Sequence, residues 1–244
     1  MCGHCRGRYL KGMIPVTDPS ALESAAGEVR AAGGHGILVS GGCDAKGKVP
    51  LQPFLPALRK VREEGGLLIN LHPGLISREE AADIAASADR ISFDLVLDAS
   101  VIRLRMNLDR VPEDYAGAFR ALCLAAPGRV VPHVLLGVGR EEDELEAVRQ
   151  ACQEDISCLI LLSLVGENVE DWDGRLIRAV KEGAGRGRPV VLGCMRPRGR
   201  PDVEMAALRA GAEGIASPSS AIIRLIEEEG WAVREHRLCC AFHR

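Results

Sequence analysis

The chain has 244 residues, of which 47% are hydrophobic and 27% charged, and its formal net charge is -3. This composition suits a soluble globular protein with an ample core and gives no indication of a basic surface for nucleic acid. No apolar run reaches the roughly 18–20 residues that cross a bilayer, and the first residues show no signal-peptide pattern. We therefore expect a cytoplasmic protein with neither nucleic acid nor membrane as a partner.

The predicted elements alternate between helices and short apolar strands. A helical pattern over 19–32 comes first, followed by a strand over 36–39 and a helix over 51–64. Further runs of about four to eight apolar, often β-branched residues follow, as expected of buried parallel strands. They lie within 65–74, 89–98, 129–138, 157–166, 188–194 and 213–218. Helix-boundary signals separate them, among them a capping box at Ser77–Glu80 and a stopping glycine at Gly211.

This order of elements predicts the fold class. Seven strands, each followed by a helix, with an extra helix in front, are what a (β/α)8 barrel without its first strand would contain. An open Rossmann-type sheet is the rival architecture, but polar residues after nearly every strand favour the barrel. We therefore predict an α/β protein with a TIM-type (β/α)8 barrel lacking its first strand. One domain is expected over 1–244, with a tail from about residue 232 to 244 closing on the barrel mouth.

In such a barrel the reactive groups gather at the carboxyl ends of the strands. Of the nine cysteines, Cys123, Cys152 and Cys158 lie in apolar or helical surroundings and are predicted to be buried. The other six lie in terminal segments or strand-end loops. The strand-end residues are Cys2, Cys5, Ser40, Gly41, Gly42, Cys43, Asp44, Asn70, His72, Asp94, Asp98, His133, Ser163, Cys194, Arg196, Arg198 and Ser217, and Cys239 and Cys240 lie in the tail.

The Cys2-x2-Cys5 pair has several interpretations. Such a pair can hold zinc, contribute to an iron–sulfur cluster or act as a redox couple. Zinc would require a second pair, and the adjacent Cys239-Cys240 is expected to point its two side chains apart. The redox interpretation requires a thioredoxin-like unit, which the surroundings do not resemble. Thiolates at short spacing favour an iron–sulfur cluster, and two thiols without a role are the remaining alternative.

A resemblance to a known superfamily joins these observations. "CGHCRGRYLKGM" resembles the end of the cluster loop of the radical S-adenosylmethionine (SAM) superfamily, in which C-x3-C-x2-C follows the first barrel strand. Cys2 and Cys5 match its second and third cysteines, and the first would fall three residues before Met1. "VSGGCD" resembles the glycine-rich segment that binds the amino group of SAM. "GCMRPRGRPDVE", "GAEGIASPS" and "CCAF" resemble the biotin-synthase-like branch, which includes components of a two-protein lipoyl synthase.

The resemblance implies roles for particular residues. Cys2 and Cys5 would ligate a [4Fe–4S] cluster whose unique iron binds SAM, and His4 would lie near the adenine. Gly41 and Gly42 would let the backbone approach the methionine end of SAM, since a Cβ would block it. The side chains expected to bind SAM ribose or substrate, or to serve in catalysis, are Asn70, Asp94, His133 and Arg196. The alternatives are a helix cap for Asp94 and an interior histidine for His133.

The other loop and tail thiols suggest a second cluster. In sulfur-inserting radical enzymes an auxiliary cluster is the sulfur source, and Cys43, Cys194, Cys239 and Cys240 are the expected ligands here. Arg196 and Arg198 would screen its charge or bind a substrate carboxylate. The alternatives are a frayed tail for the adjacent cysteines and a solvated basic loop for the arginines.

The resemblance implies a radical SAM enzyme that inserts sulfur at an unactivated C–H bond, as a lipoyl synthase component acting on an octanoyl group. The expected partners are an acyl chain on a carrier protein or peptide, a second radical SAM protein and an electron donor such as ferredoxin. The alternatives are radical SAM chemistry without sulfur transfer, a non-catalytic iron–sulfur accessory protein, and a TIM-barrel lyase or aldolase. We expect a further cysteine and a strand before Met1, and weak cluster binding if the chain is complete as given.

Overall fold

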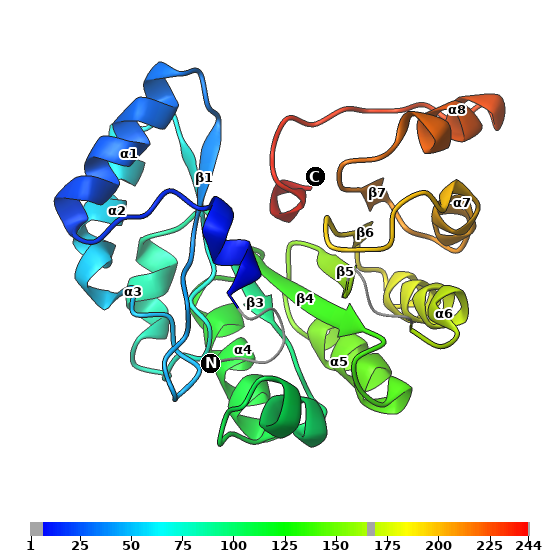
Figure 1. Cartoon of the computed structure of the whole chain (residues 1–244), viewed down its shortest axis with the longest axis horizontal. Helices are drawn as coiled ribbons and strands as arrows, with labels where there is room; N and C mark the ends of the chain where they lie inside the picture. The colour runs from blue at the N-terminus through cyan, green and yellow to red at the C-terminus, as the bar shows by residue number, and fades with distance from the viewer. Residues whose placement is uncertain (1–6, 165–168, 244) are drawn as a thin grey trace. The chain divides into compact units, whose positions relative to one another are not determined.

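The computed structural model describes residues 7–164 and 169–243 (Figure 1). Its sheet contains seven strands over these residues, all paired in parallel where registers are defined, and hydrogen-bonded in chain order. They are β1 (Gly36–Val39), β2 (Leu68–Leu71), β3 (Arg90–Asp94), β4 (Val130–Leu136), β5 (Leu159–Ser163), β6 (Val190–Leu192) and β7 (Gly214–Ile215). Each strand lies in a run that the sequence predicts, which confirms all seven.

Helices connect successive strands, as parallel neighbours require. The α-helices are α1 (Pro19–Ala31), α2 (Leu55–Glu64), α3 (Ala81–Ala86), α4 (Pro112–Ala125), α5 (Glu141–Gln153), α6 (Trp172–Gly185), α7 (Pro201–Arg209) and α8 (Ser220–Glu228). The described residues also form three 3-10 helices, η1 (Arg8–Gly12), η2 (Gln52–Phe54) and η4 (Cys240–Phe242), and a π-helix, η3 (Val101–Arg105).

Local signals explain where several helices begin and end. Asp18 caps α1 by accepting the Ala21 N–H at 2.9 Å, and Gly211 follows α7 with φ +114°. One of the two hydrogen bonds of the predicted capping box is described, in which the Ser77 N–H donates to the Glu80 carboxylate at 2.9 Å. The α-helix α3 begins at Ala81, directly after Glu80. The π-helix η3 was not predicted.

The chain divides into two compact units, which we describe separately. The first comprises the residues up to Phe93 together with Ala99–Val130, and the second comprises Asp94–Asp98 with Val131 onward. In the first unit, Phe93 is 1% exposed and its ring meets those of Tyr115 and Phe119 in α4. In β2 and β3 the alternate positions carry polar side chains: Asn70 and Ser92 lie on the other face of these strands.

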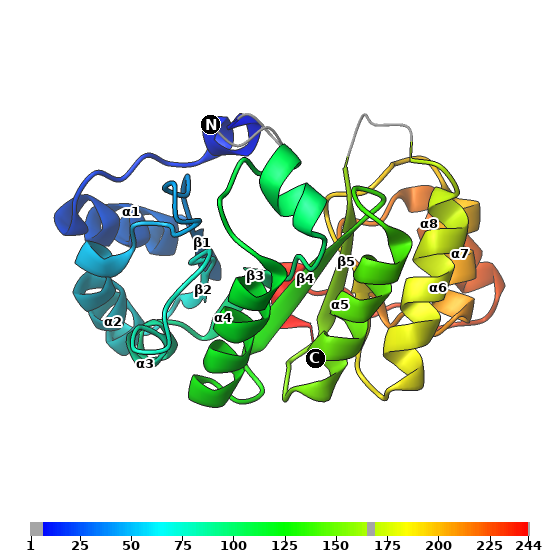
Figure 2. The same cartoon turned by 90° about the horizontal axis from the view of Figure 1, so that it is seen from below.

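In the second unit both faces of the strands are covered. Helices α5 and α6 pack against each other and against β5 (Figure 2). Leu159 and Val190 face α6, since a Cβ on Gly183 would lie within 3.0 Å of both side chains. On the other face, the C-terminal tail packs against the alternate strand residues. That cluster consists of Val131, Cys158, Ile160, Val191 and Ala241, with Leu162 and Cys240 packed against it.

Candidate functional site

In the first unit, the turn after β1 leaves its backbone accessible. Among the residues that the structure describes, a Cβ on Gly42 would meet only Leu10 Cδ1 of η1, at 3.6 Å, and a Cβ on Gly41 would lie 3.3 Å from Val49 Cγ1. Neither glycine has a φ in the left-handed region, so backbone conformation does not require glycine here. Helix η1 therefore lies beside this turn, and within the described part of the chain the backbone at Gly42 is otherwise uncovered.

Beyond the glycines, the loop after β1 is closed by one carboxylate. Asp44 accepts the N–H groups of Lys46 and Lys48 at 2.8 and 3.0 Å, and these bonds hold its pKa below the ordinary value. Cys43, which precedes it, is exposed. The exposed Cys43 thiol therefore lies beside the turn that the Asp44 carboxylate holds in place.

Two other predicted strand-end residues of this unit join β1, β2 and β3. Asn70 is 2% exposed and accepts the Ser92 hydroxyl at 3.0 Å, so a neighbouring strand orients its amide. The carbonyl of His72 accepts the Ser40 hydroxyl at 3.3 Å, and the His72 N–H donates to Val39 at 3.0 Å. These bonds fix the ends of β1 and β2 relative to each other.

The second unit brings Asp94 and His133 to adjacent positions on neighbouring strands. The N–H of Leu95, directly after Asp94, donates to the His133 carbonyl at 2.9 Å. Both side chains are half-buried. His133 pairs in register with Ile160, so it lies on the face that the tail contacts. Their proposed contact with SAM or substrate stays a prediction.

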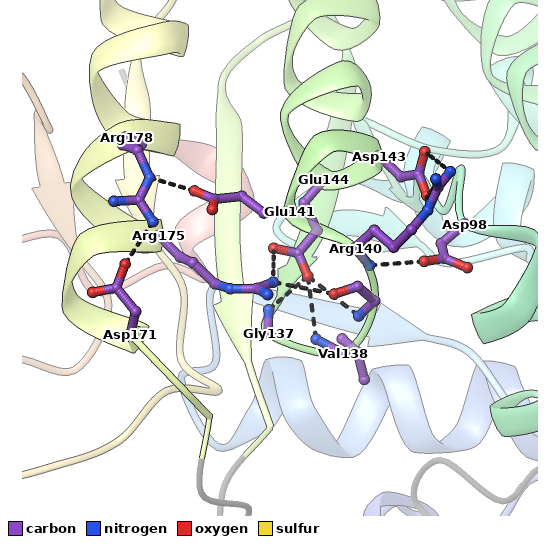
Figure 3. A network of polar contacts seen from close by, with 11 residues as sticks. Asp98, Gly137, Val138, Arg140, Glu141, Asp143, Glu144, Asp171, Arg175 and Arg178 are labelled. Atoms are coloured by element: carbon purple, nitrogen blue, oxygen red, sulfur yellow. Dashed lines mark hydrogen bonds and ion pairs between the residues drawn. The ribbon is translucent and has the colours of Figure 1, made fainter.

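A buried carboxylate organises the loop after β4 (Figure 3). Glu144 is 6% exposed, and its Oε1 accepts the N–H groups of Gly137, Val138 and Gly139 at 2.7, 3.2 and 3.3 Å. Its Oε2 lies 3.0 Å from Arg175 Nη1, which also donates to the Gly139 carbonyl at 3.1 Å. Burial raises the pKa of Glu144, while Arg175 and the loop N–H groups act in the opposite direction.

Further charges support the same loop. The Arg140 N–H donates to Asp98 at 2.8 Å, and its guanidinium pairs with Asp143 (Figure 3). Arg178 pairs with Glu141, and with Asp171 at 2.7 Å. This network connects the loop after β4 to the start of α6.

Sequence reasoning missed Glu144. Its segment, "GREEDELEAVRQ", predicts an exposed helix face, and that is wrong for this residue. The available signal was the pair Gly137 and Gly139, directly after a strand and before a helix, where loop N–H groups need an acceptor. Gly137 has φ +80°, and a Cβ there would lie 2.1 Å from Val169 Cγ1, so no side chain fits.

Three of the predicted metal-ligating thiols belong to the second unit. The sulfur atoms of Cys239 and Cys240 are 4.0 Å apart, so the expectation that they diverge is wrong. Cys239 is the residue that precedes η4, with φ -55° and ψ 149°, and Cys240 is the first residue of that helix. Cys194 and Cys158 lie near enough to help raise the pKa of Cys240, after the larger effects of Cys239 and burial. Cys43 belongs to the first unit.

The described residues contain no group of three or more His, Cys, Asp or Glu side chains arranged to hold a metal ion. Cys2, His4 and Cys5 lie outside those residues, so their predicted roles in cluster and SAM binding stay predictions. Cys123, Cys152 and Cys158 are buried, as predicted, and burial raises the pKa of Cys152 to about 11.

The arginines after β6 are engaged by protein groups. Arg196 is 2% exposed, pairs with Glu204 at 2.6 Å, and donates to the Gly193 and Ala216 carbonyls at 2.7 Å each. A solvated loop is therefore the wrong interpretation for Arg196. Arg198 is exposed and donates to the Ser217 and Cys194 carbonyls at 2.6 and 2.9 Å. These bonds tie the ends of β6 and β7 together, and a catalytic role for Arg196 stays a prediction.

The fold is similar to that of several solved enzymes. Methylornithine synthase (PylB) aligns with a TM-score of 0.63 at 15% identity, over 96% of this chain and 79% of that one. HydG, a maturase of the [FeFe]-hydrogenase, aligns with a TM-score of 0.62 at 12% identity, over 94% and 60%. The HMG-CoA lyase from Brucella melitensis aligns with a TM-score of 0.59 at 13% identity, over 91% and 88%.

These likenesses show an α/β fold of the TIM type, which confirms the coarser part of the predicted fold class. No family model and no curated protein matches the sequence. None of the helices in the described residues is long and apolar enough to span a membrane. A missing first strand stays a prediction.

Proposed function

We propose that this chain is a radical SAM enzyme. Two of its structural neighbours, PylB and HydG, are radical SAM enzymes, and the segment "CGHCRGRYLKGM" resembles the cluster loop of that superfamily. The observation that carries the proposal is the position of Leu10 in η1. It lies against the Gly41–Gly42 turn, so the chain following the Cys2-x2-Cys5 pair returns to the segment expected to bind SAM.

The backbone of this turn supports the proposal of a SAM site there. Gly41 and Gly42 would present backbone to its methionine end, with no Cβ in the way. Cys2 and Cys5 would contribute thiolate ligands to a [4Fe–4S] cluster. When bound, the cluster supplies the electron that cleaves SAM, and SAM supplies the radical that removes hydrogen from an unactivated C–H bond.

The residues of the second unit would bind and orient the substrate. Asp94 and His133 lie on adjacent strands and offer a carboxylate and an imidazole to polar groups of a bound molecule. Glu144 would act through the backbone, since it holds the loop over Gly137–Gly139 in one conformation. Arg196 would hold the β6 loop that carries Cys194.

A finer proposal rests on sequence resemblance alone. "GCMRPRGRPDVE" and "CCAF" support a biotin-synthase-like enzyme that inserts sulfur into an octanoyl group, as one component of a lipoyl synthase. The ligands that the sequence predicts for an auxiliary cluster are Cys43, Cys194, Cys239 and Cys240, and this assignment stays a prediction. The enzyme's partners would be an acylated carrier, a second radical SAM protein and an electron donor such as ferredoxin. Two clusters per chain would support sulfur insertion, and one would count against it.

Anaerobic reconstitution with iron and sulfide tests the main proposal. The DNA upstream of the Met1 codon is sequenced first. The protein is then prepared with and without the residues that this DNA encodes. We expect bound iron and sulfide, and 5′-deoxyadenosine formed from SAM when dithionite is added. Gly42→Val should weaken SAM binding at least tenfold, whereas Gly185→Ala, on an open face of α6, should leave it unchanged. Preparations that bind neither iron nor SAM would refute the proposal and favour a lyase, to which the HMG-CoA lyase likeness points.

A further inference from the structure

The C-terminal tail is attached to the second unit by a few residues. Residues 231–237 are exposed, whereas Ala241 is 0% and Phe242 6% exposed. Ala241 packs against Val131, Ile160 and Val191 on the strand face opposite the helices. The anchoring contacts are therefore confined to the end of the chain, behind an exposed connection.

Cys240 is part of this anchor. Its side chain packs against the same cluster, and its carbonyl accepts the Cys158 thiol at 3.9 Å. His243 lies next to β7, where its Nδ1 would be 3.1 Å from a Cβ on Gly214. Because Ile160 is in register with His133, the tail covers the face that carries the His133 side chain.

Cys239 is the exposed neighbour of this anchored thiol. Its sulfur is 4.0 Å from that of Cys240, about twice the length of a disulfide bond. Consecutive Cα atoms are about 3.8 Å apart, below the roughly 4.4 Å at which unstrained disulfides begin. A disulfide between these two residues would therefore be strained and easily reduced, which is the property of a regulatory bond.

We propose that Cys239 and Cys240 form a reversible redox site whose oxidation releases the tail from the strands. The oxidant is a low-molecular-weight disulfide. The Cys239 thiolate attacks one of its sulfurs and expels the first small thiol. Cys240 then gives up its proton and attacks the Cys239 sulfur, which expels the second. Two protein thiols are oxidised to one disulfide, and the small disulfide is reduced to two thiols.

The structure explains why Cys239 reacts first and why release follows. Cys239 is exposed and open to a dissolved disulfide, whereas Cys240 is only partly exposed and packs against the buried cluster. Bond formation must close a 4.0 Å gap to about 2.05 Å, which draws the Cys240 sulfur toward the exposed residue. That movement removes Cys240 from its contacts beside Cys158 and leaves Ala241 and Phe242 without their support.

The experiment combines peptide mapping with hydrogen exchange in glutathione buffers. In oxidised buffer we expect a Cys239–Cys240 disulfide and at least tenfold faster exchange of the Phe242 N–H, which donates to the Cys239 carbonyl at 2.9 Å. Reduction should restore the slow exchange. Cys239→Ser should exchange slowly in both buffers, and Cys43→Ser, which alters an exposed thiol of the first unit, should behave as the wild type.

Three outcomes would overturn the proposal. The first is a disulfide from Cys240 to Cys158 or Cys194 in place of Cys239. The second is an oxidised tail that exchanges as slowly as the reduced one. The third comes from a separate iron assay: loss of bound iron in Cys239→Ser would assign the pair to a metal. The exchange measurement uses neither SAM nor iron, so its failure is distinguishable from failure of the proposed enzymatic activity.

Discussion

The Glu144 carboxylate and the Arg175 guanidinium form an ion pair of 3.0 Å between α5 and α6, with side-chain exposures of only 6% and 21%. Both groups also bind the backbone of the loop after β4. A charge pair in such a position serves to fix the loop, because either partner alone would be left uncompensated in a largely dry environment.

Removal of the Glu144 charge should therefore destabilise the protein. We expect Glu144→Gln to lower the free energy of unfolding by about 3 kcal/mol, because Arg175 loses its partner and the loop N–H groups lose an ionic acceptor. Urea denaturation measures this change. Glu142→Gln, on the exposed side of the same helix, is the control and should stay within about 0.5 kcal/mol of the wild type. Equal effects of the two substitutions would contradict the assigned network.

Substitution of Gly137 tests how tightly the loop after β4 packs against the loop after β5. Gly137→Ala should cost at least about 2 kcal/mol, because φ is +80° and the new Cβ would lie 2.1 Å from Val169 Cγ1. Val169→Ala in the same chain should recover part of the loss. The matched control is Gly117→Ala in α4, an open helical position where alanine should stabilise by about 0.5–1 kcal/mol. Thermal melting of the wild type and these three variants provides the comparison.

Substitution of Arg196 distinguishes a structural role of this residue from a catalytic one. We expect Arg196→Met to lose about 3 kcal/mol of unfolding free energy, because it leaves Glu204 buried without a partner. Arg196→Met combined with Glu204→Leu should regain part of that stability, whereas Arg198→Met, at an exposed position, should change it by less than about 1 kcal/mol. If Arg196→Met keeps full stability yet abolishes activity, the structural assignment is incorrect.

Thiol accessibility can be read directly by alkylation. In the folded chain iodoacetamide should modify Cys43, Cys194 and Cys239 and spare Cys152, because the latter is buried and its pKa is raised to about 11. Cys152 should remain protonated, and therefore unreactive, as the pH rises to about 10. Mass spectrometry of tryptic peptides gives the extent at each site, with the urea-unfolded chain as the reference. Rapid modification of Cys152 at neutral pH would show that α5 is packed differently.

Asp44 gives a pH-dependent prediction. Its pKa is lowered by the Lys48 and Lys46 N–H groups, so the stabilisation it provides is present above the ordinary value of 3.8 and is lost as the pH falls through the lower, folded-state pKa. The measurement is the NMR chemical shift of the Asp44 carboxyl carbon as a function of pH. We expect its midpoint to lie below 3.8 in the folded chain and near 3.8 in urea. A folded midpoint at or above 3.8 would mean that the loop over residues 44–48 is open in solution.

The sequence by itself determined the strands and their order. Buried parallel strands are continuous apolar runs, so Val130–Leu136 and Leu159–Ser163 are recognisable from local composition. Asp18 and Gly211 marked helix ends because capping depends on residues a few positions apart. The strand-end rule placed Asp94 correctly, at the last residue of β3, whereas His133 lies in the middle of β4 and not at its end.

Only the tertiary structure decided which charges and thiols are buried. Glu144 is enclosed by Arg175, 31 residues away, and the Cys240 carbonyl meets a thiol 82 residues away, at Cys158. Local periodicity assigns a glutamate in an acidic helix to the exposed face. For two adjacent cysteines, the sequence does not show which one packs against the core. Burial depends on contacts between segments distant in the chain, and the desolvation and pairing that result exist only once those segments have packed.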